Sequence, residues 1–420
     1  MDNTISQPQK LWNRDFSLLV FGQMVSIFGN MILSFALPLY ILSISGSPTL
    51  FGLVLALPFV SLIITSPIGG LIADRFRKQR IMFWLDAATT VIIVLYMVFS
   101  GLFLEVVPLV IVKLMALNAI QGLYMPAVQS SVPVLVPMDK MVSANSVVAM
   151  INTTSSMAGT AIAGVLLARF GLFPILAVSA VCFAITAVMD LLIRIPYQPQ
   201  ESSGSMREIV KGDLRMAFRF IVKEKPTIAK GALLAFFLNV TIGPLLLVGI
   251  PVLVTQILGM GMDMVGLSQS VMMAGGVVGG ILAGMLGARL SIQKAYLLLA
   301  IGGMTLLPMG LAFLFDLPNA VIYIVITLAS ALTMLVLQMS TILLISYIQL
   351  ETPTELVGKV MSLLVILPFI ANALGQLVYG VFFERFEDTP WLVIFATVLA
   401  GGAIALYARK HFGRGHSHGA

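Results

Sequence analysis

Charged residues are dense in one short stretch, residues 69–82, which reads GGLIADRFRKQRIM. Four cations and one carboxylate lie there, although only 10% of all residues are charged. An acid next to several cations at a helix end can hold two neighbouring helices in one conformation. The alternative is that the charges only orient the chain in a membrane. That accounts for the cations but not for Asp74, because acids contribute little to orientation.

No pattern in the sequence is typical of catalysis. It contains no phosphate-binding glycine loop, no His-Glu zinc pattern and no Gly-x-Ser-x-Gly motif. The single cysteine, Cys182, excludes an internal disulfide and a cysteine metal site. We also expect no metal site in the tail, although it carries His416 and His418. The chain is therefore expected to be no enzyme and to bind no cofactor.

The composition requires a lipid environment. Apolar residues make up 59% of the chain and its mean hydropathy is +1.04. This is more apolar residues than the core of a water-soluble protein can bury. A helix crosses hydrocarbon with about 20 apolar residues, and strands would instead alternate. The sequence therefore predicts an all-α membrane protein with twelve transmembrane helices. The expected spans are 15–43, 48–73, 80–103, 106–128, 142–168, 171–194, 228–257, 264–288, 292–315, 318–348, 356–384 and 389–409.

The positive charges predict the orientation of these spans. With the N-terminus in the cytoplasm, 21 of the 24 Lys and Arg residues fall on the cytoplasmic side. Only Arg169 and Arg385 fall outside, and Lys113 lies within a span. We expect a multi-pass protein of the cytoplasmic (inner) cell membrane with both termini inside the cell. The net charge of +6 then reflects orientation and contact with anionic lipids, not nucleic-acid binding.

The spans fall into two groups of six, separated by the polar interval 195–230. Basic residues recur there every fourth position, which predicts an amphipathic helix on the inner leaflet, with a regulatory partner site as the alternative. We expect two pseudo-symmetric six-helix bundles at 1–194 and 228–410, a linker at 195–227 and a cytoplasmic tail at 411–420.

A weak internal repeat supports the two bundles. At a shift of 214–216 residues, Gly70 and Arg75 correspond to Gly284 and Arg289, and a pair of glycines recurs in each half. Such repeats are typical of transporters that rock one half against the other. Small residues let membrane helices pack closely. The expected packing glycines are Gly159, Gly164, Gly375 and Gly380.

Lys113 is the one cation expected within a span. A charge at that depth is costly and suggests function. Lys113 would bind an acidic substrate or titrate during a transport cycle. The alternative is that its ammonium group snorkels to the outer surface, about seven residues away.

The opening stretch resembles the loop signature of the major facilitator superfamily, Gly-x-x-x-Asp-Arg followed by a basic cluster. The segments LWNRDFSLLVFGQMVSIFGN and TPTELVGKVMSL resemble the branch that holds macrolide-efflux and enterobactin-exporter proteins, and the resemblance covers nearly the whole chain. It implies a gate that stabilises the outward-open state, with Asp86 as the intramembrane partner of the basic cluster. We call these residues the gating loop: Gly70, Asp74, Arg75, Lys78, Arg80 and Asp86.

The resemblance also implies that the first, fourth, seventh and tenth helices line a substrate cavity. The candidate cavity residues are Gln23, Asn30, Lys113, Asn118, Gln121, Asn239 and Gln338. For each amide the alternative is hydrogen bonding between helices. A mainly apolar cavity with a few polar anchors suits amphipathic molecules better than sugars or phosphate.

Several positions depart from the family pattern, among them residues 30 and 160. Asn30 stands where many relatives carry an acid, and Thr160 replaces the proline of the fifth-helix antiporter motif. These departures argue against the usual carboxylate-based proton coupling. The resemblance implies a monomeric, proton-driven exporter of a drug such as a macrolide, or of a siderophore-like metabolite. The alternatives are an importer or lipid transporter of the same fold, and a membrane sensor or assembly protein without transport.

Overall fold

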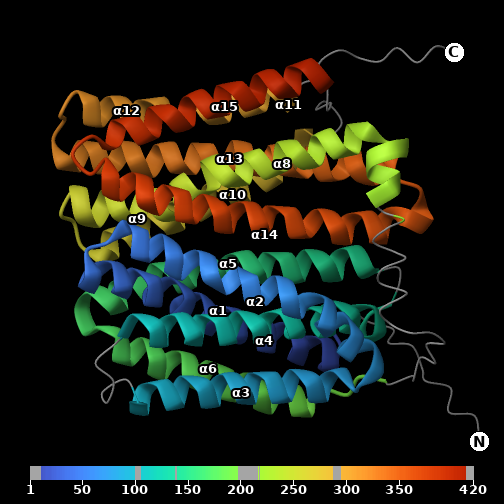
Figure 1. Ribbon diagram of the computed structural model, residues 1–420. Coiled ribbons are helices and arrows are strands. Elements are labelled where there is room, and N and C mark those ends of the chain that lie inside the picture. Colours follow the sequence, from blue (N-terminus) through green and yellow to red (C-terminus); the bar gives the residue numbers. More distant parts are fainter. Residues whose placement is uncertain are drawn as a thin grey trace, which may run out of the picture. The chain divides into compact units, whose positions relative to one another are not determined.

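The computed structural model describes residues 11–99, 106–137, 140–196, 216, 218–286 and 295–412. Within these residues the chain is helical without strands, and twelve helices are long and apolar enough to cross a membrane. The predicted fold class and number of spans are therefore confirmed. The first six helices are α1 (Arg14–Ser45), α2 (Pro48–Arg75), α3 (Lys78–Phe99), α4 (Val106–Leu135), α5 (Met141–Phe170) and α6 (Leu172–Leu192) (Figure 1).

The later elements form the other six spans. The seventh span is built from α8, η3, α9 and η4, and the ninth from α11 and α12. The elements are η2 (Phe220–Glu224), α8 (Pro226–Pro244), η3 (Leu245–Gly249), α9 (Ile250–Val252), η4 (Leu253–Ile257), α10 (Met262–Leu286), α11 (Ala295–Met304), α12 (Leu307–Leu314), α13 (Asn319–Glu351), α14 (Thr354–Arg385) and α15 (Pro390–Phe412).

The chain forms two compact units, and helix α2 is divided between them. Unit 1 holds the described residues of Met1–Ile44 and Leu57–Ser202, and unit 2 holds those of Ser45–Ala56 and Ser203–Ala420. Within unit 2, α14 caps the start of α2: Glu384 Oε2 accepts hydrogen bonds from Ser47 Oγ at 2.6 Å and from the Thr49 backbone N–H at 2.9 Å. A carboxylate is stabilising at a helix N-terminus.

Glycines set the close helix contacts of unit 1. A Cβ atom on Gly69 of α2 would lie 2.5 Å from the Gly122 carbonyl oxygen of α4, whereas one on Gly70 would meet open space. Helix α2 continues past both glycines to Arg75, and of the two only Gly69 makes a close approach. Gly159 of α5 lies against α1, where a Cβ would come within 2.8 Å of Met31 Cβ. Gly164 is buried in α5.

In unit 2, glycines likewise allow close packing of α10 on α13, and these two helices lie side by side (Figure 1). A Cβ atom on Gly275 or Gly279 would overlap the backbone carbonyl oxygen of Ala331 or Leu335, respectively. The two glycines are four residues apart, the spacing of small residues at close membrane-helix contacts. The expected packing glycines Gly375 and Gly380 of α14 approach α8 and the first turn of α2, respectively.

The seventh span is widened by two π-helical turns around its prolines. In η3 the Ile250 N–H donates to the Leu245 carbonyl, five residues back. The next donor in that pattern would be residue 251, a proline without an N–H. Gln269 of α10 supplies the missing donor, because its Nε2 bonds the Leu246 carbonyl at 3.0 Å in a buried position. The Gln269 side chain thus replaces the backbone hydrogen bond that Pro251 cannot donate to Leu246.

Replacing Gln269 with leucine is expected to destabilise the protein. The Leu246 carbonyl would be left buried without a donor, which costs about 1–3 kcal/mol. The measurement is the thermal unfolding midpoint of purified protein in detergent. Leu267→Ala, at an exposed position of the same helix, serves as the control. Equal midpoints for the two variants would show that the bond contributes nothing.

The predicted interfacial helix falls largely outside the described residues. Its described part ends in η2, where Phe220 and Ile221 pack with Leu344 and Ile348 of α13 in one apolar cluster. Lys225 follows, and its Nζ lies 2.6 Å from Glu351 Oε2. The hydrogen bond to this carboxylate raises the pKa of Lys225 above its usual value. The end of the linker is therefore tied to the end of α13.

Candidate functional site

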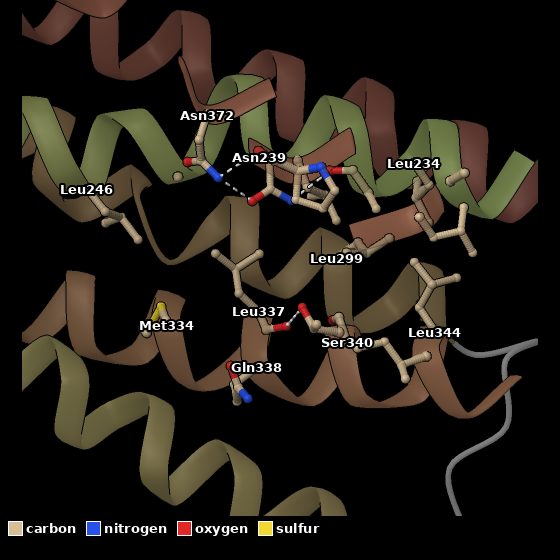
Figure 2. Close-up of a pocket in the computed structure, with 18 of the residues that line it drawn as sticks. Leu234, Asn239, Leu246, Leu299, Met334, Leu337, Gln338, Ser340, Leu344 and Asn372 are labelled. Atoms are coloured by element: carbon tan, nitrogen blue, oxygen red, sulfur yellow. Dashed lines mark hydrogen bonds between the residues drawn. The ribbon is translucent and has the colours of Figure 1, made fainter. Parts of the chain in front are cut away.

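Unit 2 encloses a cavity of about 420 Å³ between α8, α11, α13 and α14. This lies in the size range of small-molecule sites, roughly 300–1,000 Å³. Its walls are mainly apolar, and leucine and methionine side chains such as Leu246, Leu299 and Met334 predominate (Figure 2). Met fills irregular space and adapts to ligands of different shape. The cavity therefore fits an apolar or amphipathic molecule.

A pair of amides forms the polar centre of this cavity. Asn372 of α14 and Asn239 of α8 point toward each other (Figure 2), and Asn372 Nδ2 donates to Asn239 Oδ1 at 2.9 Å. Asn372 Nδ2 also donates to the Pro368 carbonyl, and Asn239 Nδ2 donates to the Ala235 carbonyl. Both donors of Asn372 are thereby used, whereas its Oδ1 accepts no hydrogen bond from the described residues. That oxygen can receive a hydroxyl or ammonium group of a ligand.

Two of the candidate cavity residues, Asn239 and Gln338, line this cavity. Gln338 lies on α13, apart from the two asparagines (Figure 2). Asn372 was missed, because the resemblance directed attention to the first, fourth, seventh and tenth helices and α14 is the eleventh span. The available signal was a lone asparagine within an apolar span.

The other candidate residues lie in unit 1. Gln23 is buried, and its Nε2 donates to the Tyr124 hydroxyl at 2.9 Å, which joins α1 to α4. Asn118 donates to the Leu114 carbonyl of its own helix. Asn30 accepts a long hydrogen bond from Ser34 Oγ at 3.4 Å. Gln121 is half-buried in α4.

Lys113 is buried between α4 and α3, with 3% of its surface exposed. Its Nζ has no hydrogen-bond partner among the described residues and lies 4.0 Å from the centre of the Tyr96 ring. The ammonium group thus makes a cation–π contact and does not reach the surface of the unit. The alternative that the ammonium group reaches the outer surface therefore differs from the buried position of Lys113 in the structure.

The gating loop residues lie at the junction of α2 and α3. Arg75 and Arg80 line an open groove of about 510 Å³ together with Trp84. Lys78, at the start of α3, donates from Nζ to the Ser130 carbonyl of α4 at 2.5 Å. The side chain of Asp74 lies outside the described residues. The gating role therefore stays a prediction.

Asp86 does not occupy the expected place beside the basic cluster. Its side chain is 2% exposed and lies within hydrogen-bonding reach of the Asp190 carboxyl group of α6. Asp190, which is 1% exposed, had drawn no functional assignment from the sequence. The two acids are 104 residues apart, so only the packing of α3 on α6 brings them together.

Twelve helices that are long and apolar enough to cross a membrane, arranged in two units, define a multi-pass membrane protein. Unit 2 contains the mainly apolar cavity. The chain belongs to the Major Facilitator Superfamily, whose model matches residues 19–367. It has the fold of that superfamily, as predicted.

Curated relatives match part of the chain. An uncharacterized MFS-type transporter, YfiS, of Bacillus subtilis strain 168 is 25% identical over 201 residues, which are 46% of this chain and 47% of that protein. Macrolide efflux protein A of Streptococcus pyogenes is 24% identical over 190 residues, 44% of this chain and 46% of its own length. The matched region thus spans about half the length of these relatives.

Solved structures share the fold over almost the whole chain. The nucleoside transporter NupG has a TM-score of 0.74 at 12% identity and covers 96% of this chain and 100% of its own. A bacterial homologue of the iron transporter ferroportin, in an inward-facing state, has a TM-score of 0.74 at 17% identity, with 97% and 100% covered. A D-xylose–proton symporter has a TM-score of 0.70 at 14% identity, with 94% and 96% covered. At these identities the likeness shows the fold alone.

Proposed function

We propose that the protein is a secondary active transporter that exports an amphipathic small molecule by proton-driven alternating access. The observation that carries this proposal is the cavity of unit 2, where an apolar wall surrounds the Asn239–Asn372 pair. Such a wall gains from burying an apolar ligand, while one or two amides orient its polar group. A sugar or phosphate would need many more hydrogen bonds or cations than these walls offer.

Export to the outside rests on the similarity to macrolide efflux protein A. We further propose that the protein works as a monomer in the cytoplasmic membrane, with both termini inside the cell, because that orientation places 21 of the 24 cations on the cytoplasmic side. No phosphate-binding loop is present to use ATP, so the proton gradient is the proposed energy source.

The test is compound accumulation in an efflux-deficient bacterium, with a panel of macrolides, dyes and siderophores, with and without a protonophore. Cells that produce the wild-type protein should accumulate less of one compound class, and the protonophore should abolish the difference. Equal accumulation across the panel would argue against the export of drugs and siderophores. Accumulation that rises in producing cells would identify an importer instead.

Asn372→Leu is expected to weaken export of that compound about tenfold, which corresponds to the loss of one hydrogen bond to substrate worth about 1.4 kcal/mol. The control is Leu374→Ala, an exposed position two residues further along α14. Concentration dependence of efflux in vesicles gives the measurement. Unchanged efflux in Asn372→Leu would show that the asparagine pair only joins α8 to α14.

A further inference from the structure

Two carboxyl groups lie face to face in the interior of unit 1. Asp86 belongs to α3 and Asp190 to α6, and these helices run side by side (Figure 1). The carboxyl groups are within hydrogen-bonding reach of each other, and at least 98% of each side chain is shielded. Within the part of the chain that the structure describes, the Oδ2 atom of each acid has no hydrogen-bond partner. An ionised carboxylate only accepts hydrogen bonds, so this arrangement lacks a donor unless one acid is protonated.

Among the described residues, no cation acts on the pair. The titratable group that faces it from α4 is Tyr124, whose hydroxyl accepts a hydrogen bond from Gln23 of α1. Ser26 of α1 lies within hydrogen-bonding reach of the same hydroxyl. The buried cation of α4, Lys113, is eleven residues from Tyr124, about 16 Å along the helix.

Other charges lie at the helix ends. Arg194 follows the end of α6, and its backbone N–H donates to Asp15 Oδ1 of α1. Arg80 lies near the start of α3, six residues or about 9 Å from Asp86. Both arginines are exposed. The ion pair Lys225–Glu351 belongs to unit 2.

Double ionisation of two carboxyl groups this close in a low-dielectric interior is strongly disfavoured, so in this conformation they hold a proton between them. Ionisable groups inside a membrane protein that are not neutralised by a partner mark ion pathways and proton relays. Asp86 lies eight residues into α3 and Asp190 two residues before the end of α6, so both are within about 12 Å of a helix end. A proton therefore has a short route between the pair and the water at that face.

We propose that Asp86 and Asp190 together form the proton-binding site of this transporter, and that the pair releases its shared proton once per transport cycle. This rests on the proposed proton-driven function and adds the site that takes the proton. It also explains how proton coupling is possible although Asn30 stands where many relatives carry a first-helix acid, because the proposed acids lie on α3 and α6 instead. The proton moves from one carboxyl oxygen to water, and the pair then carries two negative charges until it is reprotonated.

The first measurement is infrared difference spectroscopy of the purified full chain during a pH titration. The wild-type protein should show the stretching band of a buried carboxylic acid, and this band should disappear in Asp86→Asn and in Asp190→Asn. In each variant the new asparagine can donate an N–H hydrogen bond to the remaining carboxylate, in place of the shared proton. Both variants should therefore remain folded, and size-exclusion chromatography checks this. Absence of the band in the wild type would overturn the proposal.

The second measurement separates coupling from transport, in liposomes with the compound class found by the accumulation assay. Both variants should lose transport driven by a pH gradient, down to the wild-type level with protonophore, and retain compound exchange without a gradient. Asp316→Asn is the matched control, because this exposed loop residue has φ +47°, which asparagine also adopts. If Asp86→Asn retains gradient-driven transport, the proposal is overturned. If the wild-type protein shows the carboxylic-acid band but no compound flux, only the proposed function is overturned.

Discussion

Replacing Gly279 with leucine is expected to abolish the folded protein. A Cβ atom at this position would overlap the Leu335 carbonyl oxygen of α13 and approach the Leu335 Cα to 2.9 Å. A backbone cannot move aside as a side chain can, so α10 and α13 must separate along the contact that Gly275 also forms. Overpacking of side chains alone costs about 1–3 kcal/mol, and displacing a helix costs more, against a total stability of about 5–15 kcal/mol.

The measurement is the yield of monodisperse protein after extraction in detergent, followed by fluorescence size-exclusion chromatography. Gly284→Leu is the matched control, since it makes the same change on the same helix where a Cβ would meet nothing within 4 Å. Both variants gain the same helix propensity, so only the contact differs. A normal yield of Gly279→Leu would show that the two helices need not approach as closely as described.

Lys113→Met is expected to abolish transport while the protein keeps or gains stability. The ammonium group is buried over the Tyr96 ring without a hydrogen bond from the described residues. A desolvated cation–π contact stabilises a cation by about 2 kcal/mol, but burial of the ammonium group without a hydrogen bond opposes this gain. A cation inside a membrane span suggests a function, so we expect Lys113 to act in the transport cycle rather than to stabilise the fold.

The test combines two readouts on the same purified protein. The unfolding midpoint in detergent should not fall, and efflux of the identified compound should drop to the level of empty vesicles. Lys410→Met, at the exposed end of α15, removes a cation without touching unit 1 and should leave both readouts unchanged. Full efflux by Lys113→Met would mean that this lysine only fills space beside Tyr96. A lower midpoint would instead show a structural role.

The sequence by itself determined the fold class and the number of spans. Lipid exposure imposes a length of about 20 apolar residues on each helix, and this length can be read without any knowledge of contacts. The family signature at Gly70, Asp74 and Arg75 likewise depends on local order along the chain. Asn239 and Gln338 were found because they are amides on the seventh and tenth spans, to which the family resemblance pointed.

Only the tertiary structure decided which polar groups meet. Asn372 joins Asn239 from 133 residues away, and Gln269 reaches the Leu246 carbonyl that Pro251 leaves without a donor. Asp86 lies against Asp190 rather than among the cations that follow Asp74 in the chain. In a membrane every face of a helix can be apolar, so hydrophobic periodicity no longer tells which face packs inward. The partner of a polar side chain is then set by helix packing.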